Sequence, residues 1–183
     1  MVIDYSIIDL LKGIHVNFYM TYSSIHYRAA TTHDIPAINR VVEQAVMTWP
    51  LAERIKKLSL NVLTYDYTDF AYYCCYVAVS KEKIVACVIW DPEQKEMLCH
   101  GLYVAPAYQS VGVGKSLLNY FYQAAKHGGS SAVLVKAERV SCDYFIKLGY
   151  QAVPATSVND YPYLYRKELK HVLSDKQPAC SSL

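Results

Sequence analysis

The spacing of apolar and polar positions becomes regular at residue 25, where it predicts a strand followed by a helix. Residues 25–30 form the first predicted strand. The helix after it has Asp34 as its N-cap and Pro36 in its first turn. Its apolar residues repeat at helical spacing, at Ile38, Val41, Val42 and Ala45.

A second helix is predicted over residues 51–60, because Pro50 ends the first one. Its apolar side is expected to contain Leu51, Ile55 and Leu58. The basic run at 54–57 is interpreted as the solvent-facing side of this helix, because a patch that binds a polyanion needs more charge. Residues 61–73 mix polar residues with tyrosines and predict no definite element.

Three strand-like runs follow in succession, at residues 75–79, 84–90 and 97–104. The turns between them are short and lie at 81–83 and 91–94. Strands joined by such short turns pair antiparallel, so this part of the chain is predicted to be an antiparallel meander.

The apolar spacing then changes to that of a helix, with a stripe at Leu117, Leu118, Phe121, Ala124 and Ala125. A strand at 132–137, a short helix at 140–148, and strands at 150–153 and 163–169 complete the order. A meander followed by one helical crossover predicts an α/β (α+β) fold. Its mixed central sheet should have about six to seven strands, with helices on both faces.

Length and composition fit one folded domain. The chain has 183 residues, of which 53% are hydrophobic and 19% charged, so it should bury a core. We expect this domain to span residues 25–169. Residues 1–24 carry no clear pattern and are interpreted as an N-terminal extension, while 170–183 are expected to be a disordered tail.

The charge and the cysteines exclude several classes of partner. A net charge of +2 is too small to indicate nucleic acid or an anionic membrane. No apolar run reaches the roughly 18 residues of a membrane span. The first residues lack the features of a signal peptide, so a cytoplasmic protein is expected. The six cysteines have the spacing of neither a zinc site nor a disulfide scaffold, so no metal is expected.

A glycine-containing turn at residues 109–114 is the main candidate for chemistry. It joins a strand to the start of a helix, where free backbone N–H groups bind phosphate well. The segment Gly112-Val113-Gly114-Lys115-Ser116 partly matches a nucleotide-triphosphate loop, but that motif needs glycine where Gln109 stands. The strand before it is also the third of a meander, so a nucleotide hydrolase is disfavoured.

The pattern Gln109-x-x-Gly112-x-Gly114 resembles the (Arg/Gln)-x-x-Gly-x-(Gly/Ala) signature of the GNAT superfamily of N-acetyltransferases. The segment 144–150, Tyr-Phe-Ile-Lys-Leu-Gly-Tyr, is similar to the family's later Phe-Tyr-x-Lys-x-Gly-Phe segment. The order of elements agrees as well, so the resemblance covers roughly residues 25–169.

This resemblance implies an acetyl-CoA-dependent N-acyltransferase, with acetyl-CoA as co-substrate and a primary amine of a small molecule or protein as acceptor. The fourth and fifth strands would diverge, and Leu102, Tyr103 and Val104 would lie beside the pantetheine arm. A backbone N–H near Val104 would stabilise the oxyanion. The pyrophosphate would be held by the amides of the turn, at Gln109, Ser110, Val111, Gly112, Val113, Gly114 and Lys115.

The groups that handle protons match the family less well. The family's acid is a tyrosine five residues before the last aromatic of the second segment, and Phe145 stands there. Tyr144 is the alternative acid, although an adjacent helical residue points about 100° away. His100 is the candidate base, predicted to share a strand face with Leu102 and Val104. A structural histidine is the other interpretation.

Two further questions stay open at the level of sequence. Tyr161, Tyr163 and Tyr165 would share a strand face, which fits either an acceptor pocket or packing against a helix. Phe145 favours a second function, in which the protein binds acyl-CoA as a sensor without turnover. Dimers are common among similar proteins, so a homodimer is one expectation for the assembly.

Overall fold

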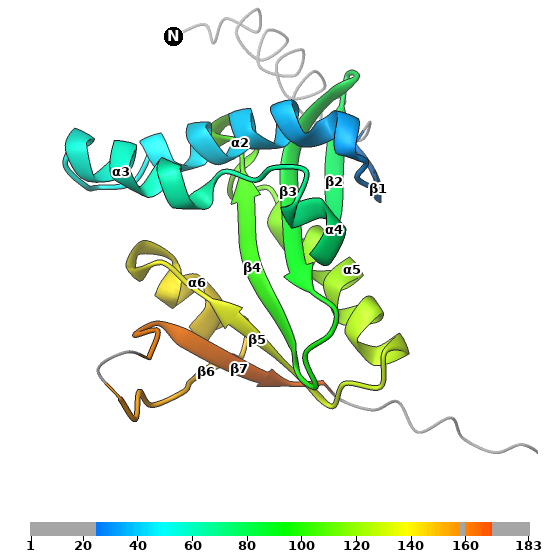
Figure 1. Cartoon of the computed structure of the whole chain (residues 1–183), viewed down its shortest axis with the longest axis vertical. Coiled ribbons are helices and arrows are strands. Elements are labelled where there is room, and N and C mark those ends of the chain that lie inside the picture. The colour runs from blue at the N-terminus through cyan, green and yellow to red at the C-terminus, as the bar shows by residue number, and fades with distance from the viewer. Residues whose placement is uncertain (1–24, 158–159, 170–183) are drawn as a thin grey trace, which may run out of the picture.

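The computed structural model describes residues 25–157 and 160–169 (Figure 1). The predicted extension 1–24 and the predicted tail 170–183 lie outside the described residues. The strands are β1 His26–Ala29, β2 Cys74–Ser80, β3 Lys83–Asp91, β4 Met97–Val104, β5 Ala132–Lys136, β6 Gln151–Ala152 and β7 Leu164–Glu168. The helices are α2 Ile35–Met47, α3 Glu53–Leu63, α4 Asp69–Tyr72, α5 Val113–His127 and α6 Cys142–Lys147.

All of these strands belong to one mixed sheet with the order β1-β2-β3-β4-β5-β7-β6. Strands β2, β3 and β4 pair antiparallel, as the short turns predict, and β1 pairs antiparallel with β2. The pairing of β4 with β5 is parallel, and α5 is the crossover between them. The predicted α/β (α+β) class with a mixed sheet is therefore confirmed.

Helices cover both faces of the sheet (Figure 1), and each face has its own apolar core. On one face α2 packs its buried residues against β2 and β3. On the other face α5 packs Leu117, Leu118 and Phe121, all fully buried, together with Phe145 of α6. The alternating residues of each strand supply both cores, because successive side chains point to opposite faces.

The start of α2 differs in detail from the prediction. Asp34 does not cap α2 with its side chain. It ends a short 3₁₀ turn, Thr32–Asp34, and its carboxylate accepts hydrogen bonds from the backbone N–H and the hydroxyl of Thr31. Two nitrogens of Arg28 bind the same carboxylate at 2.8 and 2.9 Å, which joins β1 to the start of α2. Asp34 therefore occupies the predicted N-cap position of α2, but its carboxylate binds Arg28 and Thr31 instead of the N–H groups of the helix.

The predicted second helix exists as α3, but its orientation is the reverse of the prediction. Ile55 and Leu58, which were expected on a packed face, are 47% and 53% exposed. Lys56, which was expected on the solvent-facing side, is buried. Its ammonium donates to the Met47 carbonyl oxygen at 3.0 Å and to the Glu53 carboxylate at 2.9 Å, so its polar end is satisfied. Its aliphatic stem supplies the packing.

Candidate active site

A cleft with a volume of about 970 Å³ lies along β4. One wall is formed by the end of α2, by α4 and by residues 62–65 at the end of α3. The opposite wall contains residues 140–148, which include α6, and residues 136–138 at the end of β5. The turn before α5 closes one end of the cleft.

The cleft exists because β4 and β5 separate. The two strands pair only at Met97, Leu98 and Cys99 of β4. Beyond Cys99, β4 continues along β3 to Val104, while β5 continues along β7 (Figure 1). The edge of β4 from residue 100 to 104 therefore has no strand beside it among the described residues.

His100 lies at a β-bulge where the separation begins. Cys99 pairs with Trp90 and Gly101 pairs with Ile89, so His100 is an extra residue in β4. The bulge changes the alternation of side chains. Cys99 and Leu102 both pack into the core beneath α5, although a regular strand would place them on opposite faces.

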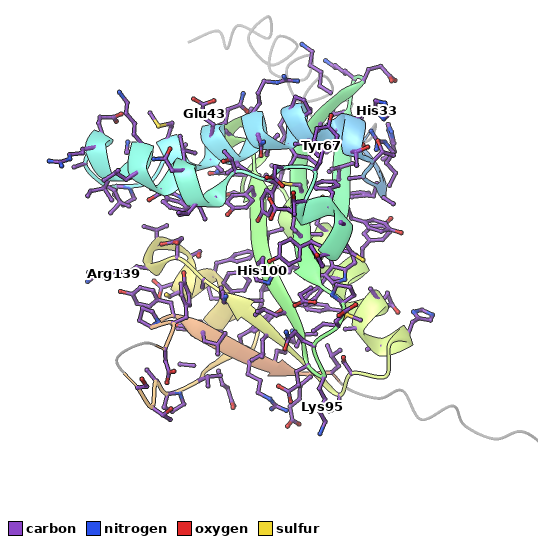
Figure 2. The ribbon with its side chains drawn as sticks, in the orientation of Figure 1. His33, Glu43, Tyr67, Lys95, His100 and Arg139 are labelled. Carbon is purple, nitrogen blue, oxygen red and sulfur yellow. The ribbon has the colours of Figure 1, made fainter. Side chains whose placement is uncertain are left out.

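The prediction that His100 shares a face with Leu102 and Val104 is therefore wrong. The His100 ring lies against the Tyr73 ring in a tilted arrangement, with the ring centroids 4.6 Å apart, and Tyr73 packs against the core beneath α2. Leu102 and Val104 pack on the α5 side instead. The physical reason is the extra residue, which shifts the alternation by one position. Figure 2 shows His100 near the middle of the molecule, on β4.

The backbone of β4 presents hydrogen-bonding groups to the opening. The Ala105 N–H donates to the Val85 carbonyl oxygen on β3 at 2.9 Å. Because these groups alternate along a strand, the N–H groups of Val104 and Leu102 point away from β3, toward the opening. The Val104 carbonyl oxygen accepts a hydrogen bond from Nε2 of Gln109 at 3.0 Å. Gln109 thus fixes the turn against β4 and leaves the Val104 N–H toward the opening.

The turn at residues 109–112 places the start of α5 at the end of this opening. Ser110 has φ +61° and Gly112 has φ +92°, so both adopt left-handed conformations. The first helical bond runs from the Ser116 N–H to the Gly112 carbonyl oxygen, so the N–H groups of residues 113–115 have no partner within the helix. A Cβ added at Gly112 would meet no atom within 4 Å. This is an open, positively polarised end of a helix, suited to an anion.

Tyr144 and Phe145 of α6 take different places. Phe145 is 5% exposed and packs in the core beneath α5, although one edge reaches the cleft. Tyr144 lies in the cleft wall, and its hydroxyl lies 3.3 Å from where a Cβ at Gly114 would be. Burial raises the pKa of Tyr144, so its hydroxyl keeps its proton at neutral pH. It can therefore act as a donor.

His100 is half-buried in the cleft. Burial lowers the pKa of His100 below its ordinary value, and the ammonium of Lys136 lowers it further. Asp91 and Asp69 act in the opposite direction but less strongly. The imidazole is therefore neutral at pH 7 and able to accept a proton.

Tyr65 forms a part of the cleft that no sequence pattern indicated. Its hydroxyl lies 2.8 Å from where a Cβ at Gly101 would be, so only a glycine allows this approach to β4. Asn39 holds the Tyr65 backbone with two hydrogen bonds, to its carbonyl oxygen at 2.8 Å and from its N–H at 2.9 Å. Tyr65 is thereby fixed across the strand, next to the bulge at His100.

Tyr161, Tyr163 and Tyr165 were expected either to line an acceptor pocket or to pack against a helix, and the structure shows some of each. Tyr161 lies in the cleft wall, and its hydroxyl donates to the Ala137 carbonyl oxygen at 3.1 Å. Tyr165 is buried in the core, and Tyr163 packs against that core. One of the three therefore faces the cleft and the others serve packing. Their separation follows from β7 beginning only at Leu164, after Tyr161 and Tyr163.

The predicted site residues are mostly brought together in this cleft. Its wall contains His100, Leu102, Tyr103, Val104, Gln109, Ser110, Gly112, Gly114, Lys115 and Tyr144. Val111 is not in the wall, and the Val113 side chain is buried in the core. Any contribution of Val113 to a ligand comes from its backbone.

Sequence reasoning missed the wall formed by the end of α2, by α4 and by residues 62–65, which includes Trp49, Tyr65, Asp69 and Tyr73. These residues come from separate turns and from the segment 61–73, where no periodicity is present. Only the packing of α2 and α4 over β4 brings them together, so no local signal could have found them. Glu138 and Lys136 reach the cleft because β5 ends beside it.

Other kinds of site find no support in the part of the chain that the structure describes. Residues 25–157 and 160–169 contain no group of three or more His, Cys, Asp or Glu side chains that could hold a metal ion. Cys75, Cys87 and Cys99 are buried free thiols, and burial raises the pKa of each. No helix within the described ranges has both the length and the apolar character to cross a membrane.

Comparison with known proteins identifies the same region. The model of an acetyltransferase (GNAT) domain family matches residues 71–152, which contain β2 to β6 and the turn before α5. A search of curated proteins finds no match.

Solved structures share the fold at low sequence identity. The PaiA N-acetyltransferase of Thermoplasma acidophilum, in complex with coenzyme A, has a TM-score of 0.70 at 14% identity, covering 80% of this chain and 99% of its own. A GNAT family acetyltransferase of Brucella melitensis with acetyl-CoA has a TM-score of 0.58 at 16% identity, covering 80% and 88%. The ribosomal-protein-S18-alanine N-acetyltransferase of Escherichia coli has a TM-score of 0.53 at 15% identity, covering 78% and 90%.

Proposed function

The chain belongs to the GNAT acetyltransferase superfamily, and from this premise we propose that it transfers an acyl group from acetyl-CoA to a primary amine. The observation that carries the proposal is the opening between β4 and β5. Unpaired backbone groups of β4 and the free N–H groups of α5 meet at this opening. An elongated ligand with an anionic part and an amide-containing arm fits both features.

Coenzyme A is such a ligand, and each part of it has a counterpart in the cleft. The backbone amides of the turn, from Gln109 to Lys115, would hold the pyrophosphate, with the Lys115 side chain beside them. The N–H groups of Leu102 and Val104 would bind the pantetheine arm as an added strand does. The Val104 N–H would also stabilise the oxyanion that forms on the thioester carbonyl. The neighbours with coenzyme A or acetyl-CoA in their structures support this assignment.

The chemistry then needs a base for the amine and an acid for the thiolate. His100 is neutral at pH 7, so it can take the proton from the incoming ammonium. The freed amine attacks the thioester carbonyl carbon and forms the new C–N bond. The nitrogen then loses its second proton to solvent as the carbonyl re-forms and the C–S bond breaks. Tyr144 holds a proton within the cleft and would give it to the departing sulfur. Solvent would then return a proton to Tyr144.

A second function is favoured by one observation. Phe145 occupies the position of the family's usual tyrosine, and its ring is buried. A protein without an effective acid could bind acyl-CoA as a sensor and not turn it over. The exposure of the Tyr144 hydroxyl to the cleft supports the enzyme over the sensor.

A thiol-release assay separates the two functions. The protein is incubated with acetyl-CoA and a panel of primary amines, and free coenzyme A thiol and acetylated product are both measured. The proposal predicts amine-dependent thiol release with stoichiometric N-acetylation of at least one amine class. Binding of acetyl-CoA without release in the presence of any amine would support the sensor instead.

A further inference from the structure

The outer face of α3 carries a stripe of exposed apolar side chains. Ile55, Leu58 and Val62 are 47%, 53% and 80% exposed, respectively. Their spacing of three and four residues places them on one side of the helix. Helix α3 packs on α2 through its other side, where Lys56 is buried. We call these three residues the α3 stripe.

The α3 stripe is continuous with the cleft. Val62 belongs both to the stripe and to the cleft wall. The opposite wall of the cleft is also bordered by exposed apolar residues, because Val140 is 43% and Tyr144 is 38% exposed. Figure 1 shows α3 and α6 projecting on the same side of the molecule. A molecule that enters the cleft from this side therefore meets apolar surface on both borders.

The interior of the cleft has a different character. Asp69 and Glu138 lie in its walls, and within the described ranges neither carboxylate forms an ion pair. Tyr73 and Tyr161 supply aromatic surface nearby, and the Lys136 ammonium lies 5.9 Å from the Tyr161 ring. Carboxylates and aromatic faces attract an ammonium group. The walls also contain the ammonium groups of Lys115 and Lys136, so the interior is charged and aromatic, with carboxylates that can orient an amine, and apolar surface follows outside it.

We propose that the acceptor is a polypeptide whose amine enters the cleft while apolar side chains close to that amine contact the α3 stripe. This inference rests on the proposed acyltransferase function. The stripe from Ile55 to Val62 extends about 10 Å at the helical rise of 1.5 Å per residue. A chain in extended conformation covers that length with about three residues. A small amine bound at the carboxylates would leave the stripe exposed to water.

A membrane surface explains the stripe less well. The stripe belongs to one helix of 11 residues, and the whole chain has a net charge of only +2. Stable attachment to a bilayer usually needs a larger apolar face or a strongly basic one. A membrane would also not account for the carboxylates inside the cleft, because anionic lipids would be repelled there.

The test uses the full chain, acetyl-CoA and two peptides of equal length. Both peptides have a free amino terminus and no lysine; one has leucines at the positions after the first residue and the other has serines there. The proposal predicts a kcat/KM at least tenfold higher for the leucine peptide. A second pair, with a blocked amino terminus and one lysine beside leucines or serines, shows which amine is used.

The stripe itself is tested with the double variant Ile55→Ser, Leu58→Ser. Both side chains are exposed, so the melting temperature should change little. The preference for the leucine peptide should fall at least fivefold through KM, with kcat unchanged. Acetylation of a small amine should stay at the wild-type rate. Lys57→Ser, on a different side of the same helix, is the matched control and should keep the preference.

Other results would overturn the inference in distinguishable ways. Equal kcat/KM values for the two peptides, or an unchanged preference in the double variant, would show that the stripe does not contact the acceptor. If the variant changed only the sedimentation coefficient, the stripe would be a contact between two copies. If it changed only binding to anionic vesicles, the stripe would be a membrane contact. Absence of transfer to every amine, small or peptidic, would instead remove the proposed function.

Discussion

The surroundings of His100 determine which protonation form of its side chain is favoured. It is the extra residue of a bulge, its ring lies on Tyr73, and its partial burial disfavours the charged form. The imidazole is consequently neutral over a wider range of pH than a free histidine. A pattern of alternating residues placed it on β4 but could not reveal the bulge, because the extra residue is visible only in the pairing with β3.

Replacing this base should slow the reaction and change its pH dependence. His100→Ala is expected to lower kcat about 100-fold at pH 7. In the wild type, the rate should fall as the pH drops through the lowered pKa of His100, so the acidic limb should lie below the ordinary histidine value of 6.5. That limb should disappear in the variant, which pH–rate profiles of both proteins would reveal. A variant with wild-type kcat and the same limb would show that the histidine is structural.

Tyr144 and Phe145 allow a reciprocal test of the acid. Tyr144→Phe removes only the hydroxyl and should lower kcat about tenfold or more, while coenzyme binding changes little. Phe145→Tyr is the control: its ring is buried in the core, so the added hydroxyl should not restore activity to the Tyr144→Phe protein. Single-turnover rates with a reactive amine would measure both effects. Rescue by Phe145→Tyr would show that the family's usual position supplies the proton after all.

The element that defines the binding end of the cleft is the start of α5. Its turn, with two left-handed residues, brings free N–H groups to the edge of β4. The glycine spacing was enough to predict this turn, because a helix start with little side-chain bulk is a local feature. The orientation of α3 was not predictable in the same way. Lys56 lies on the buried side of α3, where its ammonium donates to Met47 and Glu53. A prediction based on apolar spacing places a lysine on the exposed side, so it could not find this orientation.

A bulky residue at Gly112 should block the anion without unfolding the domain. Gly112→Val would meet no protein atom within 4 Å, although its φ of +92° strains any side chain there, and its side chain would lie where a bound pyrophosphate approaches the backbone. The dissociation constant for acetyl-CoA should rise at least tenfold, as calorimetric titration would measure. Gly129→Val is the matched control, because Gly129 has φ +77°, equally free surroundings and a place at the other end of α5. Equal affinities for the two variants would mean that the turn does not bind the coenzyme.

The order of the strands and helices in the molecule could be predicted from the sequence. The separation of β4 from β5 is visible only in the structure. The meander and the crossover helix were predictable because short turns and a change of period are local signals. The cleft depends on β4 and β5 pairing over only a few residues, and on Tyr73, the residue after α4, lying against His100 at the bulge. The walls from α2, α4 and α6 therefore come from long-range packing. This is why the proposed coenzyme side could be predicted from residues 102–115, whereas the proposed acceptor side could not.

If acetyl-CoA binds in this cleft, it should raise the melting temperature of the purified protein. A ligand that binds only the folded state at a hundred times its dissociation constant adds about 2.7 kcal/mol to the free energy of unfolding. For a domain of this size that corresponds to a rise of about 5–10 °C. We expect this rise with acetyl-CoA and none with ATP and magnesium. A rise with ATP and magnesium, and none with acetyl-CoA, would show that the cleft does not bind the coenzyme.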